Sequence, residues 1–111
     1  MTRRGEYVIA LVTAPDLKTA RKLAAAAVRP KLAACVNILP RIESHYWWKE
    51  KLERKAELLL VFKTARKNVA RLQQTILEAH PYETAEFIVF TIDSGSETYL
   101  KWIGASVSDV E

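Results

Sequence analysis

The sequence predicts an α+β fold with the element order strand, helix, strand, strand, helix, strand and a further C-terminal helix. Three observations support this prediction. Short apolar runs rich in β-branched residues alternate with segments whose apolar residues recur every three or four positions. Two of the strands follow each other directly, separated only by a charged turn. With 111 residues, three glycines and four prolines, the chain is expected to form a single domain over residues 1–111.

A strand followed by a helix is predicted at the start of the chain. Tyr7 to Val12 is a continuous and partly β-branched apolar run, which is typical of a strand buried on both faces. Asp16 is the expected N-cap of the helix, with Thr13 as a second candidate, and Pro30 ends it. The apolar residues of this helix recur at spacings of three and four: Leu17, Ala20, Leu23, Ala24, Ala27 and Val28.

The next two strands are predicted to form a long hairpin. "LAACVNILP" indicates a strand from Leu32, and "RIESHYWWKEKLERKAELLLVFK" indicates its continuation, a charged turn at residues 49–51 and a return strand ending at Lys63. The segment from Leu32 to Trp48 is much longer than the mean strand of about five or six residues. We therefore expect the hairpin to project from the domain, where its edge is available to pair with a neighbouring subunit.

A second helix is predicted from Arg66 onward. His80 lies on the inner edge of its apolar face, and Pro81 ends it because proline disfavours helical backbone in the residue before it. The apolar positions that define the face are Val69, Leu72 and Ile76, with Leu77 beside them.

The last two predicted elements are a strand over residues 85–92 and a short helix over residues 97–107. The helix contributes Leu100, Trp102 and Ile103 as apolar residues. Taken together, the six main elements have the split β-α-β order of ferredoxin-like domains.

The face of the sheet opposite the two main helices is expected to be apolar. In this topology right-handed crossovers place both helices on one face. A bare face would alternate polar and apolar residues, but "YVIALV", "AACVNIL", "LLLVF" and "FIVF" are apolar at odd and even positions alike. About ten apolar side chains, roughly 1,000 Å² in all, exceed the few hundred usual on a monomer. We expect the C-terminal helix to cover part of this face and a symmetric partner the rest.

Composition and motifs exclude several functional classes. The net charge of +4 is too small for a nucleic-acid-binding arm, and no stretch approaches the roughly 20 apolar residues of a membrane span. The apolar run after the first arginines is too short for a signal peptide, and one cysteine requires no oxidising compartment, so a cytoplasmic location is expected. Neither GxSxG, a glycine-rich phosphate loop, HExxH nor CxxC occurs. We therefore expect no classical enzyme, no nucleic-acid partner and no membrane partner.

The segment "HPYE" is the best candidate for chemistry. His80, Tyr82 and Glu83 offer an acid or base, a phenol and a carboxylate within four residues. The alternative is purely structural: His80 caps the helix, Pro81 ends it, Tyr82 packs and Glu83 pairs with a lysine. The residues alone leave both interpretations open.

Three further positions have a structural and a functional interpretation. Cys35 is either a small buried residue of a strand or a soft ligand for Cu(I), although one sulfur is not a site and His45 and His80 are the only histidines. Lys63 either faces an anion in a cleft or reaches solvent. The aromatic run at residues 46–48 either packs against another subunit or stacks on bases, but the spaced aromatic signature of RNA-recognition domains is missing.

Several motifs together resemble one known family. "TAPD", "KLAACVNILP", "SHYWWK", "KAELLLVFKT", "HPYETAE" and "YLKWI", in this order, are similar to the CutA family of divalent-cation tolerance proteins, from about Val8 to Ile103. The resemblance implies a homotrimer similar in architecture to PII signalling proteins, with hairpins pairing between subunits. It also implies a role in tolerance to copper and other divalent metals, and no settled enzymatic activity.

The resemblance also implies a ligand-binding cleft between subunits. No cofactor is required, and copper, another divalent ion or a small anion is the candidate ligand, with His80 as the candidate metal ligand. The residues carried over by position are Cys35, Asn37, Tyr46, Trp48, Lys63, His80, Pro81, Tyr82, Glu83 and Glu86. The alternatives are a structural or partner-binding trimer without metal, and an uncharacterised enzyme that uses the cleft.

The chain departs from the family pattern at four positions. Some members that bind copper have a cysteine where this chain has Val12 and a histidine where it has Ala79, so that only His80 of those three positions has a metal-binding side chain here. Members often have glycine in the turns where this chain has Arg41 and Glu50. Either these turns avoid positive φ, or the two residues tolerate the strain.

Overall fold

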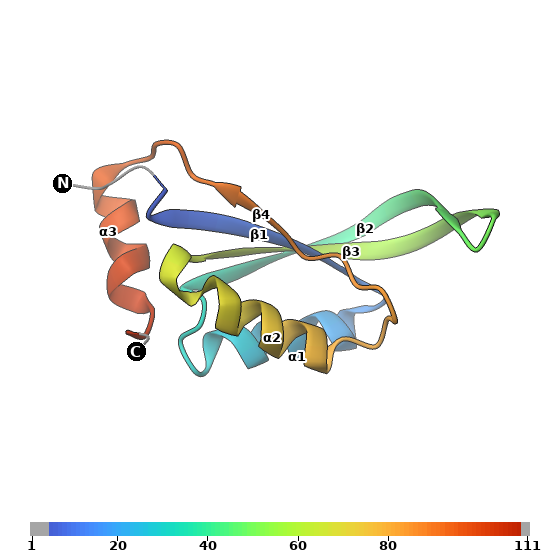
Figure 1. Ribbon diagram of the computed structural model, residues 1–111, viewed down its shortest axis with the longest axis horizontal. Coiled ribbons are helices and arrows are strands. Elements are labelled where there is room, and N and C mark those ends of the chain that lie inside the picture. The colour runs from blue at the N-terminus through green and yellow to red at the C-terminus, as the bar shows by residue number, and fades with distance from the viewer. Residues whose placement is uncertain (1–4, 110–111) are drawn as a thin grey trace.

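The protein is built on a four-stranded antiparallel sheet with two helices on one face and a third helix at one end (Figure 1). The computed structural model describes residues 5–109. The strands are β1 (Tyr7–Ala14), β2 (Cys35–Trp48), β3 (Lys51–Ala65) and β4 (Ile88–Thr91), in the spatial order β2-β3-β1-β4. The helices are α1 (Leu17–Val28), α2 (Val69–Ala79) and α3 (Glu97–Ser106). The predicted α+β class and element order are confirmed.

Local sequence signals set the ends of the two main helices. Asp16 is the N-cap of α1, and its carboxylate accepts a 2.7 Å hydrogen bond from the Thr19 backbone N–H. α2 begins three residues later than predicted, because residues 66–68 form the separate 3₁₀ turn η1 (Arg66–Asn68). α2 ends at Ala79, and His80 has extended backbone angles, as expected before Pro81.

The strand before α3 is shorter than predicted. β4 covers only Ile88–Thr91 instead of residues 85–92, and it pairs only with residues 8–11 of β1. The chain before β4 runs alongside the sheet without joining it. Hydrogen bonds from His80 and Tyr82 hold this connection against β1 and β3 instead. Residues 85–87 therefore belong to the connection before β4 and not to the strand.

The β2–β3 hairpin projects from the body, as predicted, and gives the molecule extents of 48 × 25 × 22 Å (Figure 1). Its two turn residues, Lys49 and Glu50, both have positive φ, at 49° and 65°. Hairpins favour such turns because they match the strand twist, but glycine or asparagine is their usual occupant. Arg41 (φ 62°) lies at a register shift between Leu39 and Ile42. Arg41 and Glu50 thus tolerate left-handed backbone.

The core lies between the sheet and the two main helices. Alternate residues of β1 and β3 point toward the helices, and Val12, Leu60 and Phe62 are fully buried there with Leu72 and Ile76 of α2. A second, smaller cluster lies under α3 and contains Tyr7, Ala65, Leu100, Ile103 and Val107. Trp102, predicted among the apolar residues of this helix, is 44% exposed.

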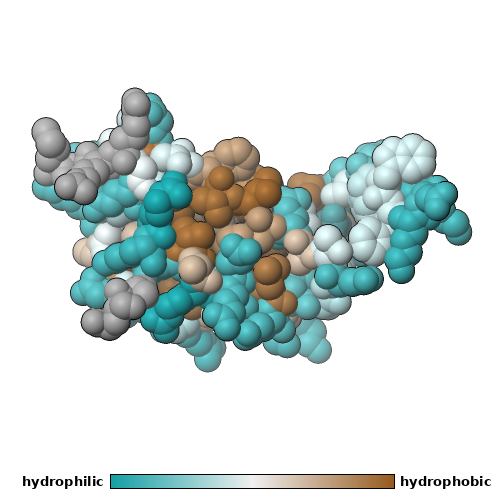
Figure 2. Space-filling view, viewed as in Figure 1, coloured by the Kyte–Doolittle hydropathy of each residue, from teal (hydrophilic) through white to brown (hydrophobic). Residues whose placement is uncertain are grey.

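The opposite face of the sheet is apolar, as the strand sequences predicted. Figure 2 shows apolar residues gathered over the middle of the body, around β1 and β4, between the polar hairpin and the polar end near α3. On this face Ile88 and Phe90 of β4 are 47% and 53% exposed. The open face, as we call it, consists of Ile9, Leu11, Leu39, Leu59, Val61, Ile88 and Phe90.

Candidate functional site

His80 holds the start of the α2–β4 connection. Its Nε2 lies 2.7 Å from the Thr13 carbonyl oxygen, and the Tyr82 backbone N–H donates to its Nδ1 at 3.1 Å. A carbonyl only accepts, so Nε2 carries the proton and Nδ1 is the acceptor. The side chain is buried, and both ring nitrogens are engaged with backbone. His80 therefore orders this connection through its neutral imidazole.

Tyr82 and Glu57 form the centre of a buried polar cluster. The Tyr82 hydroxyl donates a 2.7 Å hydrogen bond to a Glu57 carboxylate that is only 5% exposed. The Lys55 ammonium lies 4.3 Å from the centre of the Tyr82 ring. Burial, followed by the Glu57 hydrogen bond and charge, raises the pKa of Tyr82. The phenol therefore stays protonated and acts as a donor to the carboxylate.

Glu86 adds a second carboxyl group to this cluster. It is half-buried, and burial, followed by the nearby negative charge of Glu57, raises its pKa. The Tyr82 cluster, as we call it, consists of Lys55, Glu57, His80, Tyr82 and Glu86. It combines two carboxyl groups, a phenol and an ammonium beside the open face, a set that suits binding of a small polar or ionic ligand.

A second cluster lies at the other end of the open face. Cys35, the first residue of β2, lies directly opposite Lys63 of β3. The Tyr99 hydroxyl of α3 is 3.8 Å from the Cys35 sulfur and 3.4 Å from the Lys63 ammonium nitrogen. The Tyr99 ring also packs against the Trp102 ring, with the ring centres 5.4 Å apart. Cys35, Lys63 and Tyr99 form the Tyr99 cluster, which places a thiol and an ammonium group side by side.

Within one subunit the two clusters are separate. Glu57 and Lys63 lie on the same side of β3, because alternate strand residues share a face, but six residues of strand place them about 20 Å apart. Asn37 is exposed on β2 opposite Val61, between the two clusters. The fold therefore does not gather the predicted residues into one site within a single chain.

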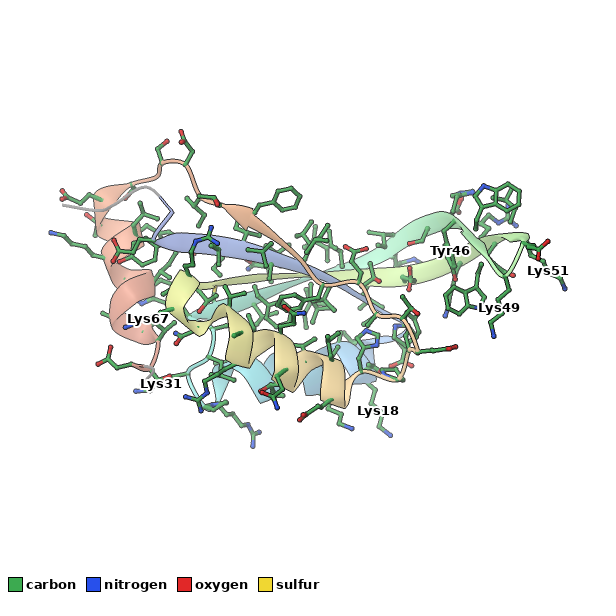
Figure 3. The ribbon with its side chains drawn as sticks, in the orientation of Figure 1. Lys18, Lys31, Tyr46, Lys49, Lys51 and Lys67 are labelled. Carbon is green, nitrogen blue, oxygen red and sulfur yellow. The ribbon has the colours of Figure 1, made fainter. Side chains whose placement is uncertain are left out.

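The remaining predicted residues lie on the surface. Pro81 and Glu83 are exposed in the α2–β4 connection. Tyr46 faces Glu53 across the hairpin, and Trp48 lies at its end with the Lys49 ammonium 5.6 Å from its ring centre. Figure 3 shows Tyr46 and Lys49 on the projecting hairpin, away from the body.

Sequence reasoning missed three important residues. Glu57 accepts the hydrogen bond from the Tyr82 hydroxyl. Its position next to the apolar run "LLLVF" was a signal that it would be buried with a partner. Lys55 and Tyr99 had no such signal, because each acts through a contact with a residue distant in the sequence.

The described residues do not form a metal site within one chain. Over residues 5–109, no three His, Cys, Asp or Glu side chains lie close enough together to hold an ion. His80 would have to give up one of its two hydrogen bonds to coordinate a metal. Within the same residues, no helix has the length and apolar character needed to cross a membrane.

These features define a small α+β protein with an apolar open face, a polar cluster at each end of that face, and a long hairpin arm. A model of the CutA1 divalent ion tolerance protein family matches residues 8–106. The chain therefore belongs to the CutA1 family.

Curated relatives and solved structures agree with this assignment. The chain is 43% identical over 105 residues to a Protein CutA homolog from Xenopus laevis, covering 95% of this chain and 70% of the relative. It is 41% identical over 99 residues to Protein CutA from Mus musculus, covering 89% of this chain but only 56% of the relative's length.

Solved structures show the same fold. CutA1 from Oryza sativa superimposes with a TM-score of 0.92 at 36% identity, covering 96% of this chain and 98% of the other. A protein from Archaeoglobus fulgidus described as a periplasmic divalent cation tolerance protein superimposes with a TM-score of 0.88 at 32% identity, covering 92% and 99%.

Proposed function

We propose that this protein acts in tolerance to divalent cations as a homotrimer that binds a small ligand between its subunits, without catalysing a reaction. Its family is named for divalent ion tolerance. The antiparallel strand order and the position of the helices support the ferredoxin-like arrangement expected for such a subunit. The observation that carries the proposal is the open face with its two polar clusters of opposite character.

The open face supports assembly because its apolar residues are too exposed for an isolated subunit. Leu39, Ile88 and Phe90 each expose more than two fifths of their surface. In a cyclic trimer each contact joins two different patches, so one end of the face on one copy meets another region of its neighbour. The long β2–β3 hairpin provides an arm that reaches such a neighbour.

The charges of the two clusters support a shared cleft. Among residues 5–109, Lys63 has no carboxylate within ion-pair distance, and Glu57 is buried with a phenol as its hydrogen-bond partner. Contact between the Tyr82 cluster of one copy and the Tyr99 cluster of the next would bring opposite charges together. In this cleft the carboxyl groups of Glu57 and Glu86 offer oxygen ligands to a cation, and Lys63 offers a charge to an anion.

His80 has a supporting role in this proposal. Its imidazole holds Tyr82 in position by accepting from the Tyr82 backbone N–H, and Tyr82 in turn binds Glu57. Loss of His80 would therefore weaken the cleft even though the ring nitrogens face backbone groups. A ligand role for His80 itself requires one ring nitrogen to give up its partner, either the Thr13 carbonyl oxygen at Nε2 or the Tyr82 backbone N–H at Nδ1.

A cytoplasmic location is part of the proposal. Its support is the single cysteine, Cys35, which is a free thiol. A free thiol persists in the reducing cytoplasm without a partner for oxidation. Fractionation of cells that express the full-length protein tests this location.

Native mass spectrometry tests assembly and ligand binding together. The protein is measured alone and with Cu(I), Cu(II), Zn(II) and a panel of nucleotides, beside His80→Ala and the matched control His45→Ala, which removes the exposed hairpin histidine. We expect a trimer that retains up to three ligands, with retention lost only in His80→Ala. A monomer would refute the assembly, and a trimer that retains no ligand under any condition would refute the ligand-binding role.

A further inference from the structure

The charge of this protein is concentrated on its helix layer. Residues 17–31 and 66–79, which contain α1, η1 and α2, carry eight of the 17 basic residues but only one of the 13 acidic residues, Glu78. The rest of the chain holds nine basic and twelve acidic residues. The helix layer is therefore strongly positive, whereas the remainder is slightly negative, and the net charge of +4 conceals this division.

The basic side chains of α1 and of its C-cap residue, Arg29, form a stripe on the outer side of the helix. Lys18, Lys22 and Arg29 follow one another at helical spacing, and all three are exposed. This stripe is opposite the buried residues that pack on the sheet, which are Ala20, Leu23 and Ala27. Figure 3 shows Lys18 and Lys31 extending from the helix layer away from the sheet.

Most of these cations form no ion pair with the described part of the chain. Among residues 5–109, ion pairs within 4.0 Å join Lys67 to Asp109, Lys101 to Glu97 and His45 to Glu43. The other seven cations of the helix layer are exposed and form none of these pairs. Arg66 is held by hydrogen bonds to the Gly5 carbonyl oxygen and the Thr91 hydroxyl. The remaining six are Lys18, Arg21, Lys22, Arg29, Lys31 and Arg71. We call these six residues the basic face.

We propose that the basic face is a docking surface for the anionic head groups of a lipid membrane. α1 and α2 pack side by side and present their outer sides as one layer (Figure 1). Clusters of four to eight Lys or Arg on a helical surface bind phosphatidylserine and related anionic lipids. Leu17, Val28 and Leu77, which are 40–42% exposed on the same two helices, add short apolar contacts at the head-group level.

Nucleic acid fits this face less well than a membrane does. Two helices side by side are about 20 Å across, too wide for the roughly 12 Å major groove of DNA. Residues 17–31 and 66–79 contain no aromatic residue on which a single-stranded base could stack. The sequence predicted no membrane partner because no segment is long enough to span a bilayer, but docking on the surface requires no such segment.

Vesicle co-sedimentation tests the proposal with a charge-matched control. The full chain is mixed with vesicles of phosphatidylcholine, with or without phosphatidylserine, beside two triple variants of equal net charge. One variant, Lys18→Gln/Lys22→Gln/Arg29→Gln, removes half of the basic face, and the other, Lys49→Gln/Lys51→Gln/Arg54→Gln, removes the same charge from the hairpin. Circular dichroism confirms that both variants keep the native helix content.

We expect binding only to vesicles with phosphatidylserine, weakened by high salt. Each lost cation near an anionic bilayer lowers the partition coefficient about fivefold, so the helix variant should bind about a hundredfold more weakly, and the hairpin variant nearly as tightly as wild type. Equal losses in the two variants, no dependence on phosphatidylserine, or tighter binding to a short DNA duplex than to vesicles would each overturn the proposal. The trimer and its cleft are measured separately by native mass spectrometry, so neither result depends on the other.

Discussion

The hydroxyl group of Tyr82 donates a 2.7 Å hydrogen bond to the carboxylate of Glu57, which is buried in β3. The two residues are 25 positions apart in the sequence. This bond joins the connection after α2 to the central part of the sheet and gives a buried carboxylate its donor. A buried charge without a hydrogen-bond partner would be strongly unfavourable.

Removal of the Tyr82 hydroxyl should therefore destabilise the fold. We expect Tyr82→Phe to lower the free energy of unfolding by about 1.5–3 kcal/mol, the usual range for hydrogen bonds to charged groups. Urea denaturation followed by circular dichroism gives this value. The matched control is Tyr46→Phe on the exposed hairpin, which should change stability by less than about 0.5 kcal/mol. Equal changes in the free energy of unfolding in the two variants would show that the Tyr82 hydroxyl does not stabilise the buried Glu57 carboxylate.

The raised pKa of Glu86 predicts that its substitution by glutamine is stabilising at neutral pH. Burial and the charge of Glu57 disfavour ionised Glu86 in the folded state. Its stabilising contribution is therefore complete below the ordinary Glu pKa of 4.5 and is lost as pH rises through the higher folded value. Glu86→Gln should be more stable than wild type at neutral pH, and this advantage should disappear toward pH 4. Thermal unfolding across this pH range measures the difference, with the exposed Glu83→Gln as control.

The hairpin turn contains strain that glycine should relieve. Glu50 has φ 65° next to Lys49 at φ 49°, a conformation that costs a residue with a Cβ about 1 kcal/mol. We expect Glu50→Gly to raise the free energy of unfolding by about 0.5–1 kcal/mol despite the greater freedom of glycine in the unfolded chain. The control Glu53→Gly, within β3, should destabilise the protein instead. A stability loss in both variants would show that the turn is not strained.

Gly104 permits close contact between α3 and β1. A Cβ at this position would lie 2.6 Å from the Tyr7 hydroxyl oxygen and within 3.4 Å of two ring carbons. Because Tyr7 is buried under α3, Gly104→Ala should cost about 1–3 kcal/mol of stability. Removing the hydroxyl in the double variant Gly104→Ala/Tyr7→Phe should recover part of this loss relative to Tyr7→Phe alone. A double-mutant cycle by urea denaturation measures the coupling, and an additive result would contradict the contact.

Elements with a local signal were predicted well. The N-cap at Asp16, the end of α2 before Pro81 and the long hairpin all depend on residues within a few positions of each other. The apolar open face was also predicted, because strands in which polar and apolar residues do not alternate have two apolar sides. The predictions were wrong where no local signal sets the boundary of an element, as at the 3₁₀ turn before α2 and at the short strand β4.

The candidate site was predicted only in part, because its contacts join distant segments. His80 and Tyr82 were recognised as a pair, but their partners Thr13 and Glu57 belong to other strands. The sequence also suggested Cys35 and Lys63 without indicating that Tyr99, 64 positions from Cys35, lies between them. The fold then separated these two groups by several residues of β3.

The amino-acid sequence by itself determined the order of the elements, the start of α1, the end of α2 and the apolar character of both sheet faces. These properties follow from backbone preferences and from patterns that repeat over one turn or two strand residues. Only the tertiary structure decided that Glu57 accepts a hydrogen bond from Tyr82 and that Tyr99 lies beside Cys35 and Lys63. Such contacts depend on strand order and register, which place residues together only when the whole sheet and its helices have formed.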